Sequence, residues 1–138
     1  MSKQLSLEKI EQYILSKPSG YLEFPFGEGV AVFKVKNKMF ATLSLGKMGK
    51  GDVKSDSSEP RDWWMNLKCD PDESVMLRDI FPSVIPAYHM NKKLWNTIIL
   101  DGSIPQGEIE RMIDNSFMLV VSKMTKKDQR SILIMLSA

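Results

Sequence analysis

The chain has 138 residues, a length typical of one globular domain with its own hydrophobic core. Hydrophobic residues make up 43% and charged residues 26%, which excludes a largely disordered chain, and the single Cys69 excludes an internal disulfide framework. The net charge of +2 neither favours nor excludes a polyanionic partner, so the distribution of charge has to decide.

No apolar run approaches the roughly 18 residues that a transmembrane helix requires. The N-terminal segment also lacks the apolar core of a signal peptide. Together with a lone thiol and ten methionines, these features lead us to expect a soluble, cytoplasmic protein with no membrane partner.

The first part of the chain predicts a helix followed by a β-hairpin. Apolar residues recur at helical spacing over residues 5–17, where a proline and a glycine then end the helix. Residues 30–35 and 39–45 are rich in β-branched, aromatic and aliphatic side chains, as strands are. Between them lies Lys36-Asn37-Lys38, and asparagine tolerates the left-handed conformation of a tight turn.

Residues 46–62 contain three glycines and three serines without an apolar period, so we expect a mobile surface loop there. A strand over residues 63–69 follows. Asp70 and Pro71 then predict the cap and first residue of a second helix, with Glu73 in the position of a capping box. The apolar face of this helix is predicted to consist of Met76, Leu77, Ile80 and Phe81.

The last part of the chain predicts a second hairpin and a long helix. Residues 85–90 and 94–100 are the expected strands, with Asn91-Lys92-Lys93 as their turn. The helix starts near Pro105, and residues 126–138 are either an irregular tail or a short helix. Residues at three- and four-residue steps define the apolar face of the long helix: Ile109, Met112, Ile113, Ser116, Val120 and Met124.

The resulting order, α-β(3)-α-β(2)-α, predicts one domain of the α+β class over residues 1–138. Hairpins give antiparallel pairing, so we expect two layers, with a single antiparallel sheet of five strands and all helices on one face.

Catalytic and metal signatures are absent from the sequence. The one histidine, His89, and the one cysteine lie far apart, whereas a zinc site needs three or four such ligands. The cluster of Asp70, Asp72 and Glu73 is explained by capping of the second helix. We therefore predict no catalytic residue, no metal and no cofactor, and a protein that is not an enzyme.

Charge is concentrated at the two predicted hairpin turns, each of which carries an asparagine and two lysines. Lysines on a two-stranded tip are well placed to reach the phosphates of a duplex. The competing interpretation is that each turn is simply solvated, since solvated turns favour the same residues. The candidate DNA-binding residues are Lys36, Asn37, Lys38, His89, Asn91, Lys92 and Lys93.

A third basic patch lies near the end of the chain, where four cations accompany Asp128. It has two interpretations: another contact with a polyanion, or a complement to the C-terminus of the preceding helix. Its members are Lys123, Lys126, Lys127 and Arg130.

Several segments resemble the signature of the MmcQ/YjbR family. They include NLKCDP at residues 66–71 and PAYHMNKKLWNT at residues 86–97, with Arg78 and Pro82 between them. The resemblance covers nearly the whole chain and implies a CyaY-like fold. It also implies a double-wing mode of DNA binding, proposed for the family from its fold, in which two β-hairpins grip the duplex. The wings correspond here to the turns at 36–38 and 91–93, which would bind double-stranded DNA weakly and with strong salt dependence.

Two other functions remain open. A protein-binding adaptor would use the sheet face, because one of the adjacent Trp63 and Trp64 has to point away from the helices. Frataxin-like iron binding ranks lower, since the first helix offers only Glu8 and Glu11 as acids. The expected oligomeric state is a monomer or a weak dimer.

Overall fold

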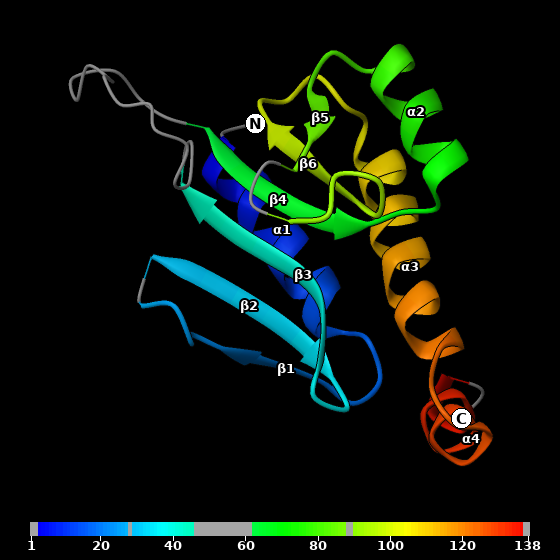
Figure 1. The fold of residues 1–138 in the computed structure, drawn as a ribbon. Coiled ribbons are helices and arrows are strands. Elements are labelled where there is room, and N and C mark those ends of the chain that lie inside the picture. Colours follow the sequence, from blue (N-terminus) through cyan, green and yellow to red (C-terminus); the bar gives the residue numbers. More distant parts are fainter. Residues whose placement is uncertain (1–2, 28, 46–61, 88–89, 137–138) are drawn as a thin grey trace.

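The computed structural model describes residues 3–27, 29–45, 62–87 and 90–136. Within these residues the chain forms helices and one six-stranded antiparallel sheet, with the strand order β1-β2-β3-β4-β6-β5. The helices pack on one face of the sheet (Figure 1), which confirms the predicted two-layer α+β class. None of the helices among the described residues is long and apolar enough to cross a membrane.

The elements follow one another in this order along the chain. The first are α1 (Lys3–Leu15), β1 (Gly20–Glu23), β2 (Val30–Val35) and β3 (Lys38–Leu45). The middle ones are β4 (Trp63–Lys68), α2 (Pro71–Ile80), β5 (Val84–Pro86) and β6 (Trp95–Leu100). The last are α3 (Gln106–Ser122) and α4 (Lys126–Leu136), so the final segment is a helix. The predicted loop at 46–62 lies outside the described residues except for its last position.

The sheet has one strand more than the five predicted. The additional strand, β1, is only four residues long and pairs with β2 alone. It follows Ser19, whose φ of 63° turns the chain sharply after α1. A four-residue segment is too short to show an alternating pattern, so its pairing with β2 creates a strand that sequence periodicity does not reveal.

The apolar face predicted for α2 is partly wrong. Leu77 is buried, but Met76 and Ile80 are 57% and 60% exposed. The side of α2 that meets the sheet instead carries Ser74 and Arg78, which hydrogen-bond to a buried asparagine of β6. A polar contact therefore sets the rotation of this helix, and two of its large apolar side chains remain in solvent.

Ser116 of α3 connects the helix layer to two strands at once. Its hydroxyl donates a hydrogen bond to the Phe40 carbonyl (2.6 Å) and accepts one from the Lys68 backbone N–H (2.8 Å). The pairing of β2 with β3 shifts between Phe33 and Lys34, and no partner in β2 is opposite Phe40. Because Ser116 is completely buried, its hydroxyl takes the place of a ladder partner at this bulge.

Packing around this point is aromatic. The rings of Phe40 and Phe117 meet edge to face with centroids 5.3 Å apart. Both are buried within one core, which the sheet shares with the inner faces of the helices. Offset and edge-on ring pairs of this kind contribute about 0.5–1.5 kcal/mol beyond the area they bury.

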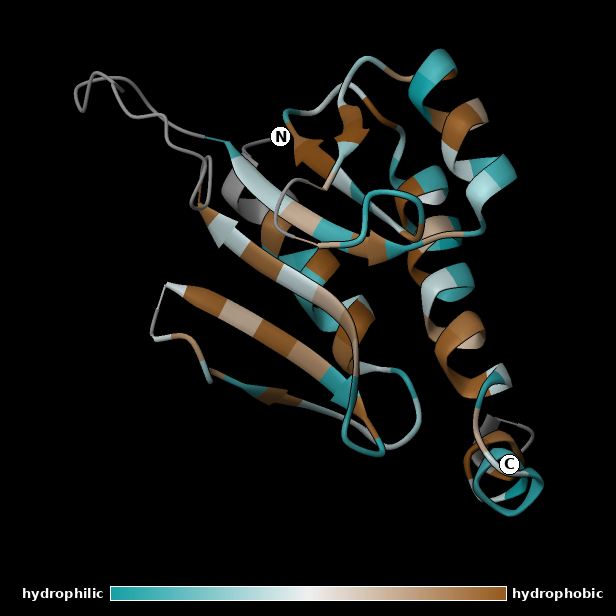
Figure 2. Ribbon diagram, viewed as in Figure 1, coloured by the Kyte–Doolittle hydropathy of each residue, from teal (hydrophilic) through white to brown (hydrophobic). Residues whose placement is uncertain are grey.

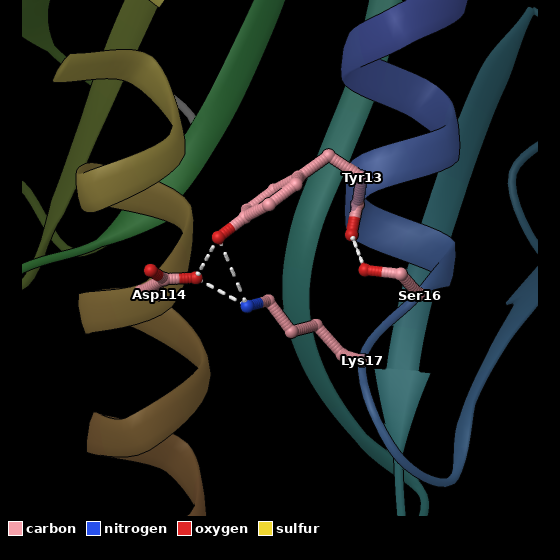
Figure 3. A network of polar contacts seen from close by, with 4 residues as sticks. All are labelled: Tyr13, Ser16, Lys17 and Asp114. Carbon is pink, nitrogen blue, oxygen red and sulfur yellow. Dashed lines mark hydrogen bonds and ion pairs between the residues drawn. The ribbon is translucent and has the colours of Figure 1, made fainter. Parts of the chain in front are cut away.

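A polar network joins α1 to α3 on the outer side of the core (Figure 3). Tyr13 donates a hydrogen bond of 2.7 Å to the Asp114 carboxylate, which also forms an ion pair with Lys17. The Lys17 ammonium lies 4.4 Å from the centre of the Tyr13 ring. Burial, followed by the hydrogen bond and charge of Asp114, raises the pKa of Tyr13 to about 12.

Replacing Ser116 with alanine should therefore destabilise the fold strongly. The substitution leaves two buried backbone groups without a partner, at a cost of about 1–3 kcal/mol each. Urea unfolding should show a loss of about 2–4 kcal/mol. Ser122→Ala is the control, since this exposed serine of the same helix only bonds its own turn. Equal effects of the two substitutions would contradict the role given to Ser116.

Candidate nucleic-acid interface

The turn between β2 and β3 is as tight as predicted. Lys36 and Asn37 have φ values of 48° and 68°, so both occupy the left-handed region. Two consecutive residues of this kind are typical of the type I′ turn, whose twist matches that of a two-stranded ribbon. Lys38 is the first residue of β3, and the side chains of both lysines are exposed.

The third basic patch begins beside this turn. The Lys36 ammonium lies 4.0 Å from the Asp128 carboxylate of α4, which places the first turn of α4 next to the hairpin. The ion pair is exposed, and such pairs contribute about 0–1 kcal/mol. Lys126 and Lys127 belong to the first turn of α4 itself, where the helix dipole disfavours cations. The alternative interpretation, in which these cations interact favourably with the C-terminus of the preceding helix, therefore does not explain Lys126 and Lys127.

The second predicted turn is a wider connection than a hairpin tip. β5 ends at Pro86 and β6 starts at Trp95, with Tyr88 and His89 outside the described residues. The main-chain carbonyl of Asn91 accepts hydrogen bonds from the backbone N–H groups of Leu94 and Trp95, at 3.0 and 2.9 Å. The expected strand over residues 85–90 is thus confirmed only in part.

The side chain of Asn91 shapes this connection. Its Oδ1 atom accepts a hydrogen bond of 2.9 Å from the backbone N–H of Lys93, which closes an Asx-turn. The carboxamide oxygen is therefore already used, and only the amide N–H groups are left for a base edge. Both Lys92 and Lys93 are exposed on the turn that Asn91 forms.

Arg78 holds the connection to the body of the protein. Its guanidinium donates to the Lys92 carbonyl (2.7 Å), to Ser74 Oγ and to Asn96 Oδ1 (both 2.9 Å). Asn96 is buried, and its Nδ2 atom has no hydrogen-bond partner. The planar Arg78 guanidinium thus links α2, β6 and the second basic connection. A lysine ammonium cannot donate to all three acceptors in this geometry. Sequence reasoning found Arg78 only as part of the family resemblance and gave it no role.

The sheet brings the two basic connections to the same end. Ala41 of β3 is level with Leu67 of β4, which in turn is level with Asn96 of β6. The start of β3, the end of β4 and the start of β6 consequently lie together, and Figure 1 shows both connections on the side where β4 ends. Measured across the sheet alone, three strand spacings of about 4.8 Å separate the two connections.

No metal centre is formed in the part of the chain that the structure describes. No group of three His, Cys, Asp or Glu side chains there is close enough to bind an ion. Cys69 is buried at the end of β4, and its backbone N–H donates to Leu94. Burial, assisted by the negative charges of Glu73 and Asp70, raises the pKa of its thiol to about 11.

The face of the sheet opposite the helices has a polar middle row, and beside it Trp64 of β4 is paired with Ile99 of β6. Thr42, Asn66 and Thr97 are paired across β3, β4 and β6 in the middle of this face, and all three are buried. Thr97 donates a hydrogen bond of 2.5 Å to Asn66, whereas the Thr42 hydroxyl has no partner. The register places Trp64 on this face and Trp63 on the helix side, so the prediction that they point in opposite directions is confirmed.

These features define a small α+β protein whose six-stranded antiparallel sheet carries helices on one face and two basic connections at one end. The YjbR family model matches residues 15–119, and the chain belongs to this family.

Bacterial relatives match over almost their whole length. The uncharacterised protein YbdF of Escherichia coli O157:H7 is 34% identical over 96% of this chain and 98% of its own. The uncharacterised protein YjbR of Escherichia coli K12 is 26% identical over 96% of this chain and all of its own.

A solved structure shares the fold. The crystal structure of Deinococcus radiodurans protein DR2400, a DUF419 domain, is 30% identical and has a TM-score of 0.73. The match covers 91% of this chain and 86% of that one. Family and fold are therefore those expected from the sequence resemblance.

Replacing Arg78 with lysine should loosen the second connection. The ammonium cannot reach Asn96, Ser74 and Lys92 together, so we expect a loss of about 1–3 kcal/mol in unfolding free energy. Amide exchange measured by NMR should be faster at Leu94 and Trp95, whose N–H groups depend on the shape of this turn. The exposed Arg130→Lys is the control. Unchanged exchange at both amides would show that Arg78 does not hold the connection.

The thiol of Cys69 should be nearly inert in the folded chain. At pH 8, a pKa of about 11 instead of about 9 reduces the thiolate fraction about a hundredfold. Alkylation by iodoacetamide should be slower by at least this factor than in urea. Since the folded-state pKa is the higher one, the stabilisation by the neutral thiol is lost as the pH rises from about 9 to about 11. Equal alkylation rates would contradict the burial of this group.

Proposed function

We propose that this protein binds duplex DNA through the two basic connections at one end of its sheet, and that its role is binding rather than catalysis. The observation that carries the proposal is the placement of two exposed lysine pairs, Lys36 with Lys38 and Lys92 with Lys93. These pairs are far apart in sequence but lie at the same end of one sheet, three strand spacings apart across it.

The contacts would be made mainly to phosphates. Lysine ammonium groups are point charges that neutralise phosphates without reading bases, so we expect little sequence preference. Four such contacts give an affinity that falls on the order of a hundredfold between about 50 and 200 mM salt. Asn91 could add a base contact only through its amide N–H groups, since its oxygen closes the Asx-turn.

In their described residues, both connections are held by contacts within the protein itself. The first is a type I′ turn beside α4, and Arg78 and Asn91 hold the second by hydrogen bonds. A surface that is already ordered loses less conformational entropy on binding. This arrangement supports a binding role for the end of the sheet, because the partly buried Arg78 guanidinium fixes the backbone at Lys92.

The alternative functions receive less support. A protein-binding adaptor that used the sheet face would have the partly exposed Trp64 and Ile99 there, but the row beside them is polar and buried, with Thr42, Asn66 and Thr97. Frataxin-like iron binding would need a cluster of carboxylates, and the described residues contain none that could hold an ion. DNA binding is therefore the function that the arrangement favours.

The test is fluorescence anisotropy of a labelled duplex of about two helical turns, titrated at several salt concentrations. Lys38→Glu and Lys93→Glu, one from each connection, should each lower the affinity about tenfold near 0.1 M salt. Each should also lower the slope of log affinity against log salt by about 0.9.

Lys9→Glu is the matched control, because it makes the same charge change at an exposed position of α1. It should leave the affinity nearly unchanged. If all three variants lose affinity equally, the attraction is a general effect of net charge and the two connections are not the interface. If the folded wild-type protein does not bind at low salt, the proposed function is wrong.

A further inference from the structure

The solvent side of α2 is an acidic and apolar ridge. Val75, Met76 and Ile80 are 55%, 57% and 60% exposed, although they are large and apolar. Asp72 and Asp79 lie on the same side and are exposed as well. In this ridge, defined by these five residues, Asp72, Met76 and Ile80 follow one another at four-residue steps. Figure 2 shows that hydrophilic and hydrophobic stretches alternate along α2.

Local helix physics does not explain Asp79. It lies in the last turn of α2, where the negative end of the helix dipole disfavours a carboxylate. Among the described residues it forms no ion pair that would compensate for this position. An acidic side chain that costs stability where it stands, next to two exposed apolar ones, is consistent with a partner that supplies a cation.

The helix α4 carries the complementary surface. A shallow groove on it, widely open to solvent, has two cations and two aliphatic side chains in its lining. The lining residues are Lys126, Gln129, Arg130, Leu133 and Ile134. Lys126, Arg130 and Ile134 also follow one another at four-residue steps, and Ile134 is 65% exposed.

The ridge and the groove cannot meet within one chain. α2 lies beside the start of α3, where Glu73 and Arg111 form an ion pair of 2.9 Å. α4 follows the other end of α3, which has 17 residues and is about 25 Å long. Figure 1 shows α2 and α4 at opposite ends of this helix. The two surfaces can therefore only come together between two molecules.

We infer that copies of this protein associate head to tail, with the α2 ridge of one copy seated in the α4 groove of the next. Opposite charges on two helix faces that also carry exposed apolar side chains provide the attraction. Two helix stripes bury less than the roughly 1,200 Å² of a standard interface, so the association is weak and depends on concentration. It weakens with salt because its charges are exposed.

Sedimentation velocity from micromolar to millimolar concentrations tests this inference. The weight-average mass of the wild-type chain should rise with concentration, and added salt should lower it. Asp79→Lys removes the acidic ridge and Arg130→Glu removes the basic groove, so each variant alone should remain a monomer. Glu8→Lys and Lys9→Glu make the same charge changes on α1 and should associate as the wild type does.

Mixing the two variants gives the decisive result. Asp79→Lys keeps a native groove and Arg130→Glu keeps a native ridge, so an equimolar mixture should regain the association that each variant lacks. A wild-type chain that remains a monomer, or a mixture that does, overturns the inference. If Asp79→Lys loses association while Arg130→Glu still associates, the contact is a symmetric one between two α2 helices, and the inference is also overturned. The inference is also overturned if Arg130→Glu loses duplex binding but has the same weight-average mass as the wild type at each concentration. The groove would then bind nucleic acid and not a second copy.

Discussion

The hydroxyl of Ser116 occupies the point at which the helix layer and the sheet are fixed relative to each other. It satisfies one backbone group of β3 and one of β4, and both would otherwise be buried without a partner. A hydrogen bond to a backbone atom depends on position more strictly than apolar packing does. The register of β3 against β4 and the position of α3 are thus specified together. The positions of the strands that flank the basic connections depend on the same contact.

The same logic operates through Arg78 at the start of β6, at the same end of the sheet. Apolar packing alone would have turned α2 so that Met76 and Ile80 pointed inward. The buried carboxamide of Asn96 instead required polar partners, which Ser74 and Arg78 supply. The rotation of α2 therefore has two outcomes: it fixes the second basic connection through the Lys92 carbonyl, and it leaves an apolar ridge in solvent.

The sequence predicted the fold class, the inner strands and the first basic turn, because these have strong local signals. Asn37 at a two-residue turn and the alternating apolar residues around it are examples. β1 was missed because its existence depends on pairing with β2 and not on its own four residues. The buried face of α2 was mispredicted because the demand for polar partners comes from β6, which is distant in sequence. The proximity of the two basic connections is a property of strand register, which no motif contains.

The strand order has a consequence for how this protein can avoid uncontrolled self-association. Both outer strands among the described residues are short, since β1 has four residues and β5 has three. β5 also ends in Pro86, which has no N–H to offer to an incoming strand. Exposed strand edges are the usual route to aggregation and amyloid-like stacking, and short or proline-bearing edges obstruct it. Contacts between copies are therefore directed to helix side chains, which unlike an open β-edge are specific and reversible.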